Sequence, residues 1–291
     1  MNNVNEIVKK SYESKKSFDK SEWAERKQKE RNDAYTLIDS TALDIVSNLD
    51  KFKKYIDIQS KFDKYSVGNA LLITAQMPNA TKMKDFDGWK EAGGFVNKNA
   101  KGIIILEPGE SYEKADGSVS QSFNPKRLFD ISQTTVKNNI KTNNYDEKLL
   151  LQALLHECPI EVKVKDKLEN EKIADWNKDD NTLYVGRDSD TTAIFYAIAK
   201  ELAKSSFDSN NSSEIIDFKS SCISYMISKK YSLDNANIEI DRIPESLKDL
   251  NAKEIRNELS EIRSVMEDIN SRMTQYFESI SKNNKDKEYE R

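Results

Sequence analysis

The segment Thr191–Ser206 reads TTAIFYAIAKELAKSS and has the spacing of an amphipathic helix. Its larger apolar residues recur every three to four positions, which is the period of one helix face. Lys200 and Lys204 are four residues apart, so a helix brings both ammonium groups to the same face. Glu201 follows the first lysine directly. The chemistry of this segment therefore depends on two cations and one carboxylate.

Residues Lys200-Glu201-Leu202-Ala203-Lys204 have the form of the zinc-protease sequence H-E-x-x-H, with lysine at both histidine positions. In that motif two histidines bind Zn²⁺ and the glutamate polarises the metal-bound water. An ammonium group has no lone pair to donate, and two of them repel a dication. We expect neither metal nor peptidase activity here. An ordinary solvated helix with Glu–Lys pairs is the alternative interpretation, and it too predicts no zinc.

The surrounding sequence predicts a mixture of helices and strands. The stretches Ile173–Trp176 and Thr182–Val185 flank a polar turn and indicate a β-hairpin, preceded by a strand at 160–164. In the first half, a continuous apolar run at 103–106 and an alternating one at 127–132 predict two paired strands, with a hairpin tip or a loose loop at 111–124. Helical periodicity is present at 34–59, 66–77, 146–157 and 213–230, and in a long run after Pro244.

We therefore expect an α+β protein. Its 291 residues suggest two domains. The first 140 residues carry 23 Lys and Arg against 20 Asp and Glu, and the rest carry 23 against 30, so the first half is the better candidate for contact with phosphates. The predicted parts are a charged N-terminal extension (1–33), a first domain (34–140), a linker (138–145), a second domain (146–245) and a C-terminal amphipathic helix with a tail (246–291).

The cysteine and histidine content and the lack of long apolar runs limit the kinds of site and the protein classes to be expected. Cys158 and Cys222 make no disulfide framework, and His156 is the only histidine. The polar start of the chain lacks the features of a signal peptide, so we expect reduced thiols in a cytoplasmic protein. No apolar run approaches the ~20 residues that span a bilayer. His156 falls at the end of a predicted helix, where an interaction with the helix dipole is the simplest role.

Several segments occur together in a fixed order in the first half. These are FDKYSVGNALLI at 62–73, QMPNAT at 76–81, Trp89, the Gly93/Gly94 turn, VNKNAKGI at 96–103, Pro108 and LFDISQT at 128–134. This order resembles the N-terminal single-stranded-DNA-binding domain of ArdC-type antirestriction proteins, which plasmids and conjugative elements carry. The hairpin and the lysine-bearing helix resemble the zincin-like domain that follows it. The resemblance spans roughly residues 35–235.

This chain departs from that family at the metal site. The two zinc histidines correspond to Lys200 and Lys204, and the later acidic ligand falls near Lys219 or Ser221. Only Glu201, at the general-base position, is retained, and without a metal it has no water to activate. The resemblance thus implies a zincin-like domain with a degenerate metal site, no cofactor and no catalytic residue.

The same resemblance implies a surface for unpaired nucleotides. A basic groove with interleaved aromatic rings is what sequence-indifferent binding of single strands requires. Gly93, Gly94 and Gly102 are clustered, which indicates positive φ or close backbone approach, or simply a tight turn. For Trp89 the alternative is a core position, and for the lysines a plain solvated charge set. The candidate DNA-binding residues are Tyr65, Asn69, Lys82, Lys84, Trp89, Phe95, Lys98, Lys101, Arg127 and Gln133.

The function expected from the sequence is single-stranded DNA binding, as an antirestriction-like protein of a mobile element with an inactive peptidase-like domain. Two alternatives stay open. One is a peptidase with an altered site. The other is an interaction protein that does not bind DNA and whose C-terminal helix recruits a partner or a second copy of the chain.

Overall fold

The described part of the first half begins with three helices. The structure, a computed structural model, describes residues 20–137, 145–187, 190–207, 212–233 and 240–289, so residues 1–19 of the predicted extension and most of the predicted linker lie outside it. Helices α2 (Lys20–Ser47), α3 (Leu49–Lys61) and α4 (Val67–Gln76) follow one another. The single helix predicted at 34–59 is wrong, because the Asn48 side chain accepts a hydrogen bond from Lys51 N (3.1 Å) and begins a new helix there.

A long antiparallel hairpin follows the helices. Strands β1 (Met83–Lys84), β2 (Ile103–Glu113) and β3 (Val119–Asp130) form a sheet in the order β1-β3-β2, and α5 (Phe86–Glu91) lies between β1 and β2 in sequence. Of the two alternatives for 111–124, the hairpin tip is confirmed, because pairing continues to Glu113 opposite Val119. The segment is polar because the far end of the hairpin is exposed on both faces, so it lacks the alternation of a half-buried strand.

Helix α4 covers the outer edge of β2 with two amide side chains. Asn69 Nδ2 donates to Leu106 O (2.9 Å), and Leu106 N donates to Asn69 Oδ1 (2.8 Å). Gln76 makes the same two bonds with Ile104, each 2.9 Å long. The helix thus supplies the partners that a neighbouring strand would supply, and it closes a sheet edge that would otherwise be open to further pairing.

The second half holds a smaller sheet and two central helices. Helix α6 (Glu147–Leu155) precedes β4 (Glu161–Lys165), β5 (Ala174–Asn177) and β6 (Thr182–Gly186). The strand order is β4-β6-β5; β4 is parallel to β6, and β5 and β6 form the predicted hairpin. Helices α7 (Thr191–Ser205) and α8 (Ser213–Lys230) follow, as their periodicity predicts, with short 3-10 turns at Ile131–Gln133 and Glu169–Glu171 elsewhere.

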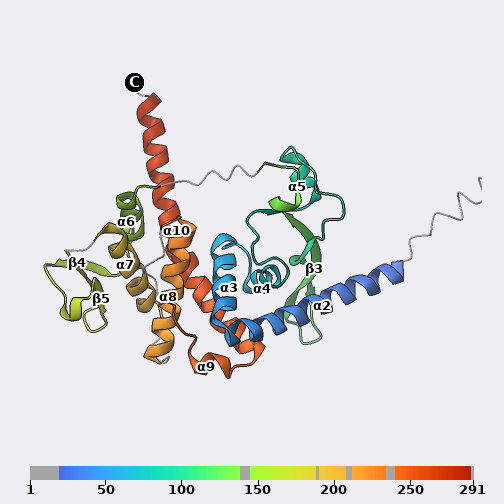
Figure 1. The fold of residues 1–291 in the computed structure, drawn as a ribbon, viewed down its shortest axis with the longest axis horizontal. Coiled ribbons are helices and arrows are strands. Elements are labelled where there is room, and N and C mark those ends of the chain that lie inside the picture. Colours follow the sequence, from blue (N-terminus) through green and yellow to red (C-terminus); the bar gives the residue numbers. More distant parts are fainter. Residues whose placement is uncertain (1–19, 138–144, 188–189, 208–211, 234–239, 290–291) are drawn as a thin grey trace, which may run out of the picture.

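The chain ends in the predicted long helix. After α9 (Glu245–Lys248), α10 (Ala252–Tyr289) passes alongside α8 and α6 and contacts α2 and α4 (Figure 1). Six of its apolar residues are buried against the rest of the chain. These are Ile255, Leu259, Ile262, Met266, Ile269 and Met273. The mixed α+β architecture with a long C-terminal helix is therefore confirmed.

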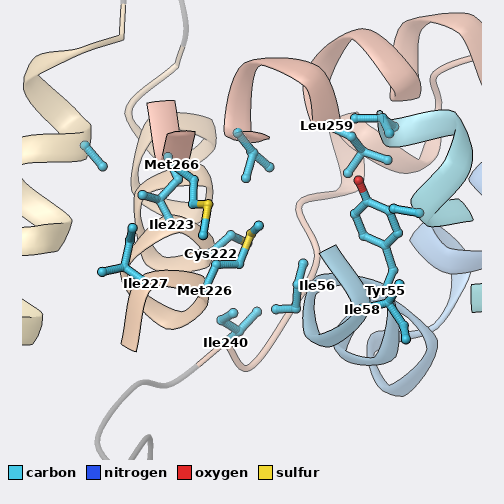
Figure 2. Packing of buried hydrophobic residues seen from close by; sticks show 14 of the residues in the cluster. Tyr55, Ile56, Ile58, Cys222, Ile223, Met226, Ile227, Ile240, Leu259 and Met266 are labelled. Atoms are coloured by element: carbon cyan, nitrogen blue, oxygen red, sulfur yellow. The ribbon is translucent and has the colours of Figure 1, made fainter. Parts of the chain in front are cut away.

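Helices from both halves share one apolar core. Figure 2 shows Ile56 of α3, Met226 of α8 and Met266 of α10 in the same cluster. The Phe52 and Phe218 rings, from α3 and α8, lie 5.3 Å apart. Across the same helices, Lys230 Nζ is 2.7 Å from Asp63 Oδ2. No helix in the described part of the chain combines the length and apolarity needed to cross a bilayer.

Candidate nucleic-acid interface and degenerate metal-site frame

Asp130, at the end of β3, organises the candidate nucleic-acid surface. Its carboxylate is buried and accepts backbone N–H groups from Thr81 (2.7 Å), Lys82 (2.9 Å) and Ser132 (3.0 Å). Burial alone would raise the pKa of this carboxyl, but the three N–H donors stabilise the ionised form and hold the pKa below its ordinary value. The strand β1 is therefore fixed against the end of β3 by an ionised side chain.

Gln133 extends this arrangement to the glycine-rich segment. Its Oε1 accepts from Asp130 N (2.9 Å), its Nε2 donates to Lys101 O (2.8 Å), and its carbonyl accepts from Asn97 N (2.8 Å). The amide of Gln133 is thus occupied within the protein. It acts as a positioning residue for the 97–101 turn.

Phe95 is presented to solvent by a tightly held backbone. Its ring is 62% exposed, and its backbone N and O are bonded to Thr135 Oγ1 and N, both at 2.9 Å. Gly93 has φ +82°, and a Cβ on Gly94 would overlap the Val136 side chain. Both of the expected reasons for glycine, positive φ and close approach, are therefore found here.

Four lysines are carried by the segments that meet at Asp130 and Gln133. Lys82, Lys98 and Lys101 are exposed and Lys84 is half-buried. Within the described residues, the ammonium nitrogen of none of the four lies within 4.0 Å of a carboxylate oxygen. The ion-paired lysines are at other positions, for example Lys27, Lys126, Lys200 and Lys230. We call these four lysines, together with Phe95, the Lys–Phe95 surface.

Two predicted DNA contacts are buried and have structural roles. Trp89 is fully buried, and its Nε1 donates to Phe129 O (2.8 Å), so the core interpretation of this residue holds and its ring cannot stack on a base. Asn69 is also buried, and both polar atoms of its side chain pair with Leu106. Neither side chain reaches solvent, so neither belongs to the Lys–Phe95 surface.

Three further side chains, two cationic and one aromatic, are ion-paired or half-buried. Arg127 is exposed, but its guanidinium is 2.7 Å from Glu30 Oε1 on α2. Lys126 lies between Asp85 (3.0 Å) and Glu107 (2.8 Å). The half-buried Tyr65 has its pKa raised, chiefly by burial. Glu30 was missed from the sequence because 97 positions separate it from Arg127 and no local pattern links them.

A second candidate site lies on α7, where the lysines at 200 and 204 face α8. Asp217 of α8 contacts both, with its Oδ1 3.0 Å from Lys200 Nζ and 3.3 Å from Lys204 Nζ. Lys204 Nζ is also 2.7 Å from Glu201 Oε1, and Glu201 Oε2 accepts the N–H of Trp176 on β5 (3.1 Å). The network of Lys200, Glu201, Lys204 and Asp217 therefore joins α7, α8 and β5.

Each charged group in this network stabilises the ionised form of its neighbours. Burial disfavours the ammonium form of Lys204, but its hydrogen bond to Glu201 and the charges of Glu201 and Asp217 raise its pKa above the ordinary value. Burial would raise the pKa of Asp217, and Lys200 and Lys204 lower it overall. Both groups consequently stay ionised at neutral pH.

The carboxylate of α8 that contacts the two lysines belongs to Asp217. That the family's acidic ligand falls near Lys219 or Ser221 stays a prediction. Ser221 lies one turn further on and lines a cavity together with Glu201, Lys204 and Asp217. Lys219 is fully buried on another side of α8 and pairs with Glu258 and with Glu261 (2.7 Å), both on α10. Helical period places 217 and 221 on one face of α8 and turns 219 away from it.

The network borders an open cavity of about 980 Å³ between β5, α7, α8 and the segment before α9. The residues in this place do not fit a divalent metal. Lysine offers no lone pair, and the part of the chain that the structure describes contains no group of three or more His, Cys, Asp or Glu able to hold a metal ion. We therefore derive no metal-dependent step for this site.

Comparison with known proteins agrees with this architecture. Residues 40–147 match the family model for the N-terminal domain of anti-restriction factor ArdC. The metal-free crystal structure of antirestriction protein ArdC from plasmid R388 aligns with a TM-score of 0.50 and 15% identity, over 72% of this chain and 86% of that one. Its Mn(II)-bound structure aligns with a TM-score of 0.51 and 14% identity, over 72% and 85%. No curated protein matches by sequence. Residues 40–147 therefore match the ArdC N-terminal domain, and the chain shares the fold of the ArdC antirestriction protein over 72% of its length.

Proposed function

We propose that this protein binds single-stranded DNA through the Lys–Phe95 surface, without base specificity, as an antirestriction protein of a mobile or conjugative element. Phosphate binding needs cations that are not already neutralised, and base stacking needs an exposed ring. The observation that carries the proposal is the coincidence of both within the ArdC N-terminal domain. Four lysines without carboxylate partners among the described residues and the exposed Phe95 ring are held on segments anchored to Asp130 and Gln133.

The proposal concerns the second half as well. We infer that residues 146–245 are a zincin-like domain that does not hydrolyse peptides. The R388 protein has been crystallised with Mn(II), and the fold it shares with this chain extends into that half. In this chain the two ligand positions on α7 are lysines engaged with Asp217 and Glu201. Glu201, at the general-base position, is bonded to an ammonium and a backbone N–H, so both of its oxygens are engaged within the protein.

The DNA-binding proposal is tested by fluorescence anisotropy with a labelled single strand, competed by duplex. Single strands are expected to compete and duplex to compete poorly. The affinity should fall with salt at a log–log slope of about −0.7 per phosphate contact. Failure to bind single strands even at low ionic strength would exclude the proposed function.

The Lys–Phe95 surface is tested by Lys98→Glu/Lys101→Glu. This variant should weaken binding to all sequences alike, on the order of tenfold or more, and reduce the salt slope by about 1.4. Lys148→Glu/Lys167→Glu is the matched control, because it changes the net charge equally at two exposed lysines of the second half. Equal losses in the two variants would indicate a general charge effect and remove the surface from the site.

Recruitment through the C-terminal helix is less favoured by the structure. Such a role requires an apolar seam that is open to a partner. Six apolar residues of α10, from Ile255 to Met273, are instead buried within this chain. The other alternative, an altered peptidase, predicts a bound metal, so stoichiometric zinc in the purified protein would favour it.

A further inference from the structure

The four side chains on α7 and α8 have the charge pattern of a loaded metal site. In a His-Glu-x-x-His frame, two neutral imidazoles and a divalent ion together carry two positive charges, and carboxylates balance them. Here Lys200 and Lys204 carry the same two positive charges, and Glu201 and Asp217 balance them. Replacing each histidine by lysine and omitting the metal thus leaves the net charge of the frame unchanged.

The positions of Asp217 and Glu201 relative to the two lysines agree with this comparison to a metal site. A single oxygen, Asp217 Oδ1, is within 3.3 Å of both ammonium nitrogens, so it lies where a ligand shared between positions 200 and 204 would lie. Glu201 bonds Lys204 from the other side and is itself held by Trp176 N. A metal ion would hold α7 against α8; these ion pairs make the same connection, and they also reach β5.

We propose that the ammonium groups of Lys200 and Lys204 take the place of a divalent metal ion in this frame, with Asp217 binding them as an acidic third ligand would bind the metal. The proposal rests on the zincin-like interpretation of the second half and is independent of DNA binding. It implies that the domain is complete without metal, and that two substitutions suffice to create a metal site.

The wild-type protein provides the first test. After incubation with Zn(II) or Mn(II) and dialysis, it is expected to retain no stoichiometric metal by elemental analysis. EDTA should leave its thermal unfolding midpoint unchanged. Stoichiometric metal, or a midpoint that EDTA lowers, would overturn the proposal, because the frame would then depend on an ion.

The second test restores the histidines. Lys200→His/Lys204→His is expected to bind one Zn(II) per chain in isothermal titration calorimetry. Adding Asp217→Ala should weaken that binding by at least about tenfold, the lower end of the loss seen even for outer-shell partners. Gln28→His/Asn32→His is the control, since it places the same i, i+4 pair on an exposed face of α2. Zinc affinity no better than that of the control would show that Asp217 is not in a ligand position.

A third variant keeps the proposal testable if the histidine pair does not fold. Asp217→Ala alone removes the partner of Lys200 and one partner of Lys204, and Glu201 remains to stabilise Lys204. It should lower the thermal unfolding midpoint by about 2–4 °C, and added Zn(II) should not restore it. An unchanged midpoint would show that Asp217 does not connect α7 and α8. Because DNA is absent from all three tests, their failure is distinguishable from failure of the DNA-binding proposal.

Discussion

Asp130 is a buried carboxylate held by backbone N–H groups. Its neighbours Thr81, Lys82 and Ser132 belong to two segments that are about 50 residues apart in the chain, and the single side chain joins them. Gln133 then ties the same turn to the segment that bears Lys98 and Lys101. The position of the Lys–Phe95 surface thus depends on a residue that makes no contact with solvent.

Asp130→Asn should therefore destabilise the protein by about 1–3 kcal/mol, because an amide cannot accept on both sides and would place an N–H against a backbone donor. The folded pKa of Asp130 lies below its unfolded value. Its contribution to stability is accordingly present above the unfolded pKa, near 4, and is lost as the pH falls through the folded pKa. Urea unfolding from pH 7 to pH 3 should show that the free energy of unfolding falls more steeply with acidification in the wild type than in the variant. Parallel curves would assign the acid sensitivity to other groups.

At the scale of elements, α4 stabilises the first sheet in place of a fourth strand. Asn69 and Gln76 are seven residues apart, so they lie on one face of the helix and reach β2 two residues apart. Each bonds both the N–H and the C=O of one strand residue. A sheet edge covered in this way cannot pair with another chain. These two amides carry no sequence signal of burial, since amides usually lie at the surface.

Asn69→Ala should lower the free energy of unfolding by about 2–4 kcal/mol, because the N–H and C=O of Leu106 would be left buried without partners. Asn79→Ala, at an exposed position near the end of the same helix, should change it by less than about 0.5 kcal/mol. Urea unfolding monitored by circular dichroism measures both. If Asn69→Ala were as stable as the control but bound DNA poorly, the result would support the direct contact between Asn69 and DNA that the sequence led us to expect.

At the scale of the whole molecule, α3, α8 and α10 join the two halves. Their apolar side chains form one cluster (Figure 2), and Lys219 adds a buried charge to the contact between α8 and α10. Lys219 is fully buried, whereas the side chains of Glu258 and Glu261 are 26% and 52% exposed. Water can therefore replace a lost partner of the glutamates more easily than it can replace a lost partner of Lys219.

Lys219→Met should change the free energy of unfolding by no more than about 1 kcal/mol, since the methionine fills much of the space and the half-exposed Glu261 can be solvated. Glu258→Ala/Glu261→Ala should cost about 3–5 kcal/mol, because it leaves an ammonium buried without a partner. Chemical denaturation of the two variants side by side measures the difference. Equal effects would indicate that Lys219 reaches water when its partners are removed.

The sequence by itself determined the local elements and argued against one chemistry, metal ligation by residues 200 and 204. Periodicity placed α7, α8, α10 and the β5–β6 hairpin, because each buries one face with a repeat that is visible in the chain. Lysine at positions 200 and 204 argued against metal ligation from side-chain chemistry alone. The ordered motifs of the first half indicated the ArdC N-terminal domain that the family model matches.

Only the tertiary structure decided which polar residues are partners. Asp217 with the two lysines, Asn69 with β2 and Glu30 with Arg127 join residues between 13 and 97 positions apart. Trp89 and Phe95 are both aromatic residues in a turn-rich segment, yet one is buried and the other exposed. Local pattern shows which face of an element is apolar, whereas the pairing of charges and amides depends on which elements meet, and the long-range packing of the core sets that.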